Sequence, residues 1–407
     1  MSELSRRSFL SRSALGASAL GASALLGGKV LGANERLSIG IIGCGDRASA
    51  LMGEIQSLAR EREAEITALC DVWKVNLGKA ASRVKGWWGR EPRQFTRYGD
   101  LLACPDVNAV VIATPDFGHT PILIAALKAG KDAYVEKPFA MEIAEANEAL
   151  DLAIQGRRVV QAGTQRRSEG AFRAAAKELG SGAIGRIVRF SVGVHFNEPR
   201  WARDFSNCRE EDVDWDAYLF NRPKRPFDPK LIRRWHLYRD FTNGLSGLWM
   251  SHYADLVSFL TGARYPASAV AHGGIYVWND GREHTDTFHA LLSYPEGFLF
   301  DWSMSLTNSA GGHFSVHGTE GTLDADAWTI SPSGGAKGTK AESRKVKPEA
   351  NLSHMGNWLE CLRSREKPYA DIQAAHQHGV TTILAAAALH TGRRQAYDPE
   401  KRERREA

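Results

Sequence analysis

A glycine-rich loop between a strand-like run and a helix-like run constrains the fold of this chain most strongly. Residues 39–42 are apolar and β-prone, the pattern Gly43-x-Gly45-x-x-Ala48 follows, and helical periodicity begins directly after it. Gly43 permits a tight turn, Gly45 lets the backbone approach a pyrophosphate, and Ala48 allows close packing of helix on strand. The helix N-terminus offers free N–H groups to phosphates. The segment therefore predicts a dinucleotide-binding unit.

A second strand pattern bears on which dinucleotide would bind. Residues 65–71 form a β-prone run that ends in Asp71, at about the distance where such units carry a ribose-binding carboxylate. A carboxylate at this place holds both ribose hydroxyls and repels a 2′-phosphate, which favours NAD. Lys74 nearby keeps NADP open as the alternative. The alternative is a domain of the same fold whose pocket binds no nucleotide.

Strand and helix patterns then alternate regularly along the chain. Strands are expected at residues 107–115, 132–138 and 158–167, and helices at 119–130 and 142–157. This alternation predicts an α/β fold with a doubly wound parallel sheet, whose ligands bind beyond the carboxyl ends of the strands. The residues expected at these ends are Thr114, Pro115, Glu136, Lys137, Gly163 and Gln165.

The pattern changes after about residue 180. Strand-like runs dominate at 186–196, 267–278, 286–306 and 312–326, and turn signals separate them. They predict a second, α+β domain on a largely antiparallel sheet, followed by helices at 354–364 and 372–390, with a surface loop at 331–347. The expected parts are a signal segment at 1–33, a nucleotide domain at 34–160, a second domain at 161–395, and a solvated, charged tail at 396–407.

The first residues predict export. Arg6 and Arg7 stand in "SRRSFL", ahead of an apolar run, which is the pattern of a twin-arginine signal. The run at 14–32 is too rich in Gly and Ser to span a membrane well, and Leu31-Gly32-Ala33 offers a cleavage point. We therefore expect a periplasmic or cell-envelope protein without a membrane span in its mature form. A disordered basic tail is the alternative.

Composition argues against several other classes. The net charge of +5 over 407 residues includes no basic block with interleaved aromatic residues, so nucleic acid is not expected as a partner. The five cysteines are scattered and odd in number, which argues against a disulfide framework and against a thiolate metal site. The histidines do not have the spacing of metal ligands, and we predict no metal. Those considered are His236, His272, His289, His313 and His317.

Taken together, the motifs resemble those of one family. The chain is similar to the Gfo/Idh/MocA oxidoreductases (glucose-fructose oxidoreductase and inositol dehydrogenase among them). The matching pieces are "GIIGCGDRA", "ATPDFGH", "EKP", "GTQRR", "GTEGTL" and "HMGNWLECLRSREKP". The resemblance implies a Rossmann domain, then a domain with a large open sheet, an active site between them, and a homo-oligomer, either a dimer or a tetramer.

The resemblance also implies roles for individual residues. Lys137 matches the lysine that lies beside the nicotinamide and touches the substrate hydroxyl, and partial desolvation there suits proton transfer. Arg166 and Arg167 are candidates for cofactor or substrate contacts, with an ordinary charge at a helix start as the alternative. The expected cofactor-binding residues are Gly43, Gly45, Asp46, Arg47, Asp71, Thr114, Pro115, His119, Glu136, Lys137 and Gln165.

One family position departs from the pattern. The family places an aspartate and a histidine four residues apart on one helix face, and His252 matches the histidine, whereas Leu248 replaces the aspartate. Either His252 acts with Lys137 alone, or Tyr238 or Asp240 fills the gap. Four tryptophans suit either sugar stacking or core packing, and they are Trp201, Trp215, Trp235 and Trp249.

Three functions follow from these observations. The favoured one is hydride transfer between a sugar or cyclitol and a tightly bound NAD(P), because free NAD is scarce outside the membrane and a folded protein could carry it through export. The second is a redox-neutral glycoside hydrolase or epimerase that uses the same cofactor. The third is a non-catalytic carbohydrate-binding protein, against which Lys137 and the intact phosphate loop argue.

Overall fold

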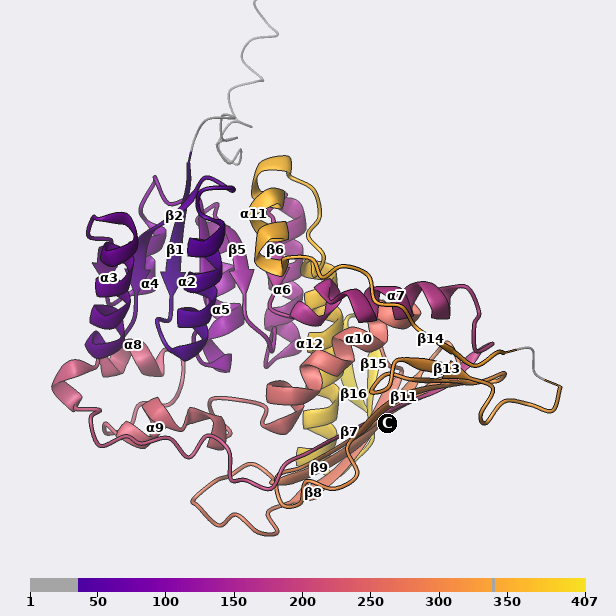
Figure 1. Ribbon diagram of the computed structural model, residues 1–407. Helices are drawn as coiled ribbons and strands as arrows, with labels where there is room; N and C mark the ends of the chain where they lie inside the picture. The colour runs from indigo at the N-terminus through magenta and orange to yellow at the C-terminus, as the bar shows by residue number, and fades with distance from the viewer. Residues whose placement is uncertain (1–35, 339–340) are drawn as a thin grey trace, which may run out of the picture. The chain divides into compact units, whose positions relative to one another are not determined.

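A six-stranded parallel sheet forms the first part of the molecule. The computed structural model describes residues 36–338 and 341–407, so the predicted signal segment lies outside the described residues. The strand order is β3-β2-β1-β4-β5-β6, as the doubly wound prediction requires (Figure 1). Every residue of β4 and β5 is buried, which is typical of a parallel sheet covered on both faces. The strands are β1 (Leu37–Ile42), β2 (Ala64–Cys70), β3 (Arg93–Phe95), β4 (Ala109–Ile112), β5 (Asp132–Val135) and β6 (Val160–Ala162), and the helices are α2 (Asp46–Leu58), α3 (Lys74–Trp88), α4 (Tyr98–Leu102), α5 (Asp116–Lys128) and α6 (Ile143–Gln155).

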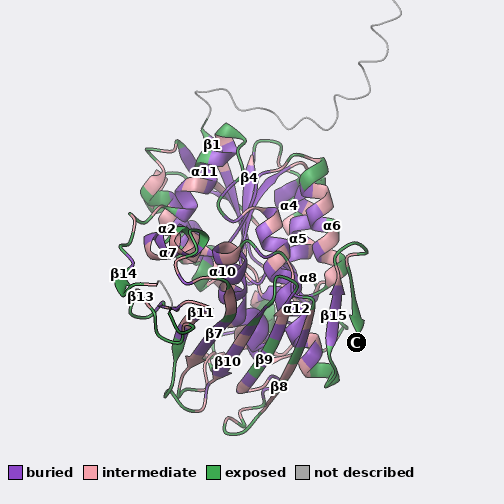
Figure 2. Ribbon diagram, turned by 90° about the vertical axis from the view of Figure 1, so that its right-hand side faces the viewer, coloured by how far each residue is buried: buried purple, intermediate pink, exposed green. Residues whose placement is uncertain are grey.

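A ten-stranded sheet forms the second part, in the order β14-β13-β12-β11-β7-β10-β9-β8-β15-β16. Only the pairing of β7 with β10 is parallel, so the prediction of a large, mostly antiparallel sheet is confirmed. Buried and exposed residues alternate along β9 and β10, as Figure 2 shows, because one face carries the core. The strands are β7 (Ile187–His195), β8 (Ser268–Gly274), β9 (Thr287–Tyr294), β10 (Phe298–Ser305), β11 (His313–Gly318), β12 (Thr322–Asp324), β13 (Thr329–Ser331), β14 (Arg344–Lys345), β15 (Gln395–Asp398) and β16 (Glu403–Glu406).

Helices cover the core face of this sheet and return to the first domain. Residues of α7 (Gly170–Gly180), α10 (Ser251–Thr261) and α12 (Ile372–Thr391) share one apolar core with the strands. The helix α12 also packs on α6, and α11 (His354–Ser364) packs on α2. The two domains are therefore joined by the helices that end the chain. Among the described residues, no helix has both the length and the apolar character needed to cross a membrane.

Two predicted boundaries differ from the structure. The strand expected at 158–167 is only β6, after which a 3₁₀ helix, η1 (Gln165–Ser168), carries the "QRR" residues. Because β6 pairs with β5, the first sheet extends past the expected domain boundary at 160.

The prediction of a solvated tail at 396–407 is wrong. Strands β15 and β16 pair as a hairpin at the edge of the second sheet, and Arg402 makes an ion pair with Asp151 at 2.7 Å. The charged side chains of β16 are exposed, as expected of an edge strand, while its backbone is bound to β15.

Residues 201–237 form a segment that we call the cap. It contains η2 (Glu210–Asp212), α8 (Trp215–Leu219), α9 (Pro229–Arg233) and η3 (Trp235–Leu237). Figure 1 shows α8 and α9 near the lower end of the first sheet. Trp73 and Val213 form a β-bridge, and the backbone N–H of Asp214 donates to the carbonyl of Val72 at 2.8 Å. The cap is thus bound directly to the loop that follows β2.

Candidate active site

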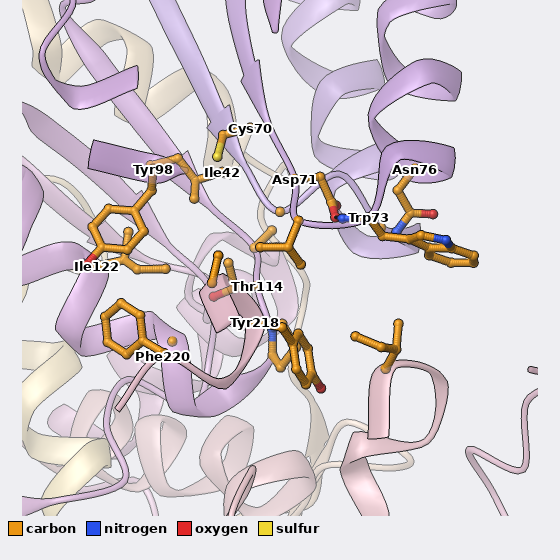
Figure 3. A pocket seen from close by; sticks show the side chains of 18 of the residues that line it. Ile42, Cys70, Asp71, Trp73, Asn76, Tyr98, Thr114, Ile122, Tyr218 and Phe220 are labelled. Carbon is orange, nitrogen blue, oxygen red and sulfur yellow. Dashed lines mark hydrogen bonds between the residues drawn. The ribbon is translucent and has the colours of Figure 1, made fainter. Parts of the chain in front are cut away.

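A cavity of about 760 Å³ lies at the carboxyl ends of β1, β2 and β4 (Figure 3). This is where a doubly wound sheet binds its ligand. Seven of the eleven predicted cofactor-binding residues line the cavity, and they are Gly43, Gly45, Asp46, Arg47, Asp71, Thr114 and Pro115. The other four do not line it and are described below, and they are His119, Glu136, Lys137 and Gln165.

The glycine loop leaves the start of α2 open. Gly43 has φ +85°, and a Cβ there would lie 2.8 Å from the backbone of Ala113, so only glycine fits without strain. Gly45 precedes α2, and no side chain caps the helix. A Cβ on Gly45 would meet nothing nearer than the Asn76 Nδ2, at 3.9 Å. The N-terminus of α2 therefore has no side-chain cap and open space beside it, as a pyrophosphate site requires.

Asp71 supplies a buried carboxylate at the end of β2. It accepts hydrogen bonds from the backbone N–H groups of Cys44 and Trp73, at 2.6 and 2.8 Å. Burial raises its pKa to about 6, although these hydrogen bonds oppose the rise. The Lys74 ammonium, the residue that kept NADP open, instead donates to the carbonyl of Glu211 in the cap at 2.8 Å. Asp71 therefore presents negative charge at the end of β2, which suits NAD and opposes a 2′-phosphate.

Unpartnered polar atoms in the cavity wall fit a polar ligand such as NAD. Within the described part of the chain, Thr114 Oγ1, Trp73 Nε1 and His236 Nδ1 are buried and have no hydrogen-bond partner. Buried polar atoms are nearly always paired, so such a group of orphans in a cavity indicates a missing partner. Together with the glycine loop and Asp71, they fit a dinucleotide.

Asp71→Asn is expected to weaken selection of NAD over NADP. A hydrogen bond to a charged group is worth about 1.5–3 kcal/mol, so the preference should fall roughly 10- to 100-fold. The ratio of NAD to NADP released from purified, denatured protein measures this. Asp100→Asn, which changes an exposed acid of the same cavity, should leave the ratio unchanged. An unchanged ratio in Asp71→Asn would contradict the assignment.

The cap forms the wall of the cavity opposite the glycine loop. Figure 3 shows Tyr98 and Phe220 side by side, with ring centroids 5.5 Å apart, and Tyr218 below Thr114. Arg203 pairs with Asp46 at 3.2 Å. The cap residues in the wall are Arg203, Asp216, Ala217, Tyr218, Phe220, Asn221, Ile232, Arg233, Trp235 and His236. A ligand in this cavity is therefore enclosed between the first sheet and the cap.

Lys137 lies just after β5. Its Nζ donates to the carbonyl of Leu248 at 2.9 Å. Burial lowers the pKa of Lys137, while the carboxylates of Asp116 and Glu136 act in the opposite direction. A desolvated amine that can gain and lose a proton is suited to acid–base chemistry.

His252 lies in the first turn of α10, directly after an irregular turn. Residues Ser246–Met250 form one turn of π-helix, η4, before α10 begins at Ser251. Leu248 lies in this π-turn and His252 in the α-helix that follows, so the two positions do not belong to one regular helix. Burial, then the charges of Lys137 and Arg166, hold the pKa of His252 well below its usual value. His252 is thus neutral, and its Nδ1 has no partner among the described residues.

Glu136 connects the residues around Lys137. Its carboxylate accepts from Arg47 Nε at 2.6 Å, from Gln165 Nε2 at 3.2 Å, and from the backbone N–H of Lys137 at 3.2 Å. His119 lies within 2.9 Å of the carbonyls of Pro138 and Thr114. Both residues hold the loops that carry the site rather than line the cavity.

The two arginines of "GTQRR" have different surroundings. Arg167 pairs with the buried Asp255 at 2.8 Å, which is a structural contact between η1 and α10. The Arg166 guanidinium lies 4.7 Å from the ring centre of Tyr253, and it lines a second cavity of about 390 Å³. Arg166 therefore remains available for a ligand, whereas Arg167 does not.

The other candidates from the sequence lie farther out. Asp240 pairs with Arg225, and neither Asp240 nor Tyr238 lines either cavity. Trp249 packs on Phe196, with ring centroids 5.1 Å apart, below the Arg200 guanidinium. Trp215 stacks on Tyr218 in the apolar core of the cap.

Sequence reasoning missed two residues. His236, considered only as a metal ligand, lies in the cavity wall between Trp201 and Trp235, with ring centroids 5.4 and 3.6 Å away. Asp116 is buried near Lys137, and Thr242 Oγ1 donates to its carboxylate at 2.7 Å. The signal for Asp116 was an acid placed directly after the Thr-Pro at the end of a buried strand.

Comparison with known proteins gives the family. Residues 37–164 match the model described as "Oxidoreductase family, NAD-binding Rossmann fold", and residues 217–324 match the GFO/IDH/MocA C-terminal domain. The chain is 25% identical to the uncharacterized oxidoreductase YdgJ of Escherichia coli over 292 residues, 71% of each chain. An inositol 2-dehydrogenase of Rubrobacter xylanophilus is 32% identical over 41% of this chain and 46% of its own.

The chain is also similar to a glycosyl hydrolase and to a dehydrogenase of known structure. A glycosyl hydrolase family 109 protein of Shewanella sp. (strain ANA-3) is 36% identical over 123 residues, 29% of this chain and 26% of its own. The WlbA dehydrogenase of Bordetella pertussis, solved with NADH and UDP-GlcNAcA, superposes with a TM-score of 0.67 at 20% identity, covering 89% of this chain and 99% of its own. With two family models that together match more than half of its residues, this chain belongs to the Gfo/Idh/MocA family of NAD-binding oxidoreductases.

Proposed function

We propose that the protein oxidises or reduces a hydroxyl-bearing carbon of a sugar or cyclitol while it keeps its NAD bound. The observation that carries this proposal is Lys137, a half-buried amine at the end of β5, next to Glu136, which accepts a hydrogen bond from Arg47 in the cavity wall. The relatives named for inositol and the structural neighbour that holds a sugar nucleotide support this substrate class.

The residues divide the chemistry between them. When bound, the nicotinamide ring exchanges the hydrogen and electron pair of the reacting C–H bond. The unprotonated amine of Lys137 accepts the proton of the substrate hydroxyl, and in the reverse direction its ammonium returns it. Neutral His252 donates or accepts one hydrogen bond, which orients that hydroxyl. Glu136 holds the Lys137 backbone in place.

The cap supports retention of the cofactor. It is bound to the first domain by the bridge between Trp73 and Val213, by an ion pair of Arg97 with Asp214 at 3.1 Å, and by an apolar cluster of Trp73, Cys208 and Val213. Departure of a nucleotide through this wall requires these contacts to break.

Val213→Glu is expected to speed NAD loss. Val213 is buried against Trp73, so a carboxylate there opposes closure of the cap and should accelerate release at least about tenfold. The fraction of nucleotide that survives extended dialysis measures the rate. Glu210→Gln, an exposed change in the same segment, is the control. Equal retention in both variants would show that the cap does not hold the cofactor.

The second candidate is a redox-neutral glycosidase, because a family 109 relative is 36% identical to this chain over 123 residues. A sugar with a leaving group at C1 separates the two functions. A glycosidase releases that group without any acceptor, whereas the proposed oxidoreductase reduces its bound NAD and stops until a carbonyl compound arrives.

We further propose export by the twin-arginine route and a homo-oligomer. Export is supported by Arg6 and Arg7 and by a cofactor that the fold can enclose before transport. Self-association is supported by exposed apolar side chains on the second sheet, at Val270, Leu291 and Leu299.

A further inference from the structure

Asp116 is a buried acid that nothing in the proposed chemistry yet uses. It opens α5, directly after Pro115, and its residue is only 3% exposed. A buried acid without a role is costly to keep, because burial penalises its charged form. Its surroundings therefore call for an explanation.

Thr242 fixes the carboxylate in one orientation. The Thr242 hydroxyl accepts from the backbone N–H of Gly244 at 3.1 Å, so its single proton is directed to Asp116 Oδ2, 2.7 Å away. The carbonyl of Thr242 in turn lies 2.9 Å from His284 Nε2. Thr242 is itself buried, so the acid is held by a rigid group rather than by solvent.

Asp116 and Lys137 approach the same short stretch of backbone. A Cβ on Gly247 would lie 3.6 Å from Asp116 Oδ2, and the carbonyl of the next residue, Leu248, accepts from Lys137 Nζ at 2.9 Å. Burial raises the pKa of Asp116 to about 7, the Lys137 charge and the Thr242 hydrogen bond lower it, and Glu136 raises it. The charges of Asp116 and Glu136 raise the pKa of Lys137, and the charge of Arg47 lowers it. The charge of Lys137 in turn lowers the pKa of four histidines. These are His119, His236, His252 and His378. At position 248 Lys137 donates a hydrogen bond to the backbone carbonyl, because the leucine side chain there offers no acceptor.

We propose that Asp116 is the positioning residue for Lys137, and that its carboxylate, aimed by Thr242, sets the pH at which Lys137 exchanges a proton with the substrate hydroxyl. Asp116 touches neither substrate nor cofactor in this role. The proton passes between the hydroxyl oxygen and Lys137 Nζ, and the Asp116 carboxylate neither gives nor takes a proton in this step. The part that concerns the substrate rests on the proposed function, whereas the charge coupling does not.

The test measures the titration of Lys137 directly. Competitive acetylation with acetic anhydride, read by mass spectrometry of the Lys137 peptide, reports the pH at which the amine becomes reactive, with or without turnover. Asp116→Asn removes the charge and keeps the shape, so the Lys137 midpoint should move to lower pH by about one to three units. Because the amine must be unprotonated to act as a base, the acidic limb of the kcat/KM profile should move the same way.

Thr242 provides the matched pair. Thr242→Val removes the hydrogen bond that favours the charged carboxylate, so it should shift Lys137 in the same direction by a smaller amount. Thr242→Ser keeps the hydroxyl and should restore the original midpoint. Glu148→Gln, which changes an exposed acid outside the cavity wall, should have no effect.

The outcomes of these tests either support or overturn the role of Asp116. A folded Asp116→Asn protein with an unchanged Lys137 midpoint overturns the proposal and leaves Asp116 a packing residue. If Asp116→Asn fails to fold, the Thr242 pair gives the same decision. A shifted midpoint in a protein that reacts with no sugar or cyclitol supports the coupling and refutes the proposed function alone.

Discussion

Replacing Lys137 by methionine should lower the rate of substrate oxidation by about 10²- to 10⁴-fold, which is the usual contribution of a positioned acid–base group. Methionine keeps much of the length and apolar character of the side chain but cannot accept a proton. Lys137 does not line the nucleotide cavity, so the bound NAD content should stay unchanged. Single-turnover absorbance of the reduced nicotinamide, measured with the bound cofactor, gives the rate.

The control for this substitution is Lys128→Met. Lys128 ends α5 on the surface, where it pairs with Glu148 at 2.7 Å, and its loss should change neither rate nor cofactor content. A Lys137→Met protein with an undiminished rate would remove Lys137 from the chemistry. A protein that lost its NAD as well would show that Lys137 holds the fold or the cofactor instead.

Replacing Gly45 by alanine should abolish cofactor binding with little effect on the fold. A Cβ at this position clashes with no protein atom, the nearest being Asn76 Nδ2 at 3.9 Å, yet it occupies the space that a pyrophosphate needs. The nucleotide content of purified Gly45→Ala protein should fall at least about tenfold, since a loss of only 1.4 kcal/mol suffices for that. Content is measured by mass spectrometry after denaturation.

Gly53→Ala is the matched change inside the same helix. A Cβ there meets nothing within 4 Å, and alanine favours a helix interior, so cofactor content should stay normal and stability should rise slightly. Normal nucleotide content in Gly45→Ala would contradict the assignment of the glycine loop as the phosphate site.

The sequence predicted those parts of the site that depend on local pattern. The glycine loop, Asp71 and the strand ends at Thr114 and Lys137 follow from alternation of strands and helices, because parallel strands end at one edge. The ladder of short antiparallel strands was predictable for the same reason, since each strand carries its own period-two pattern.

The remaining features depend on tertiary contacts. The hairpin at the chain end was missed because its exposed, charged residues have the composition of a tail, and only pairing with β15 makes them a strand. The π-turn at Ser246–Met250 leaves the residue types of an ordinary helix unchanged. The sequence did not single out Asp116 and His236 for this site, because their surroundings come from residues distant in sequence. Thr242 donates to Asp116, and Trp201 stacks on His236.

One measurement tests the central claim, that this protein is a sugar or cyclitol oxidoreductase with a retained NAD. Protein purified without added nucleotide is denatured, and the released nucleotide is identified and counted by mass spectrometry. The account predicts about one NAD or NADH per chain, and reduction of that bound NAD when a suitable sugar or cyclitol is added first. A protein that contains no nucleotide, and that releases any added NAD freely, would contradict it.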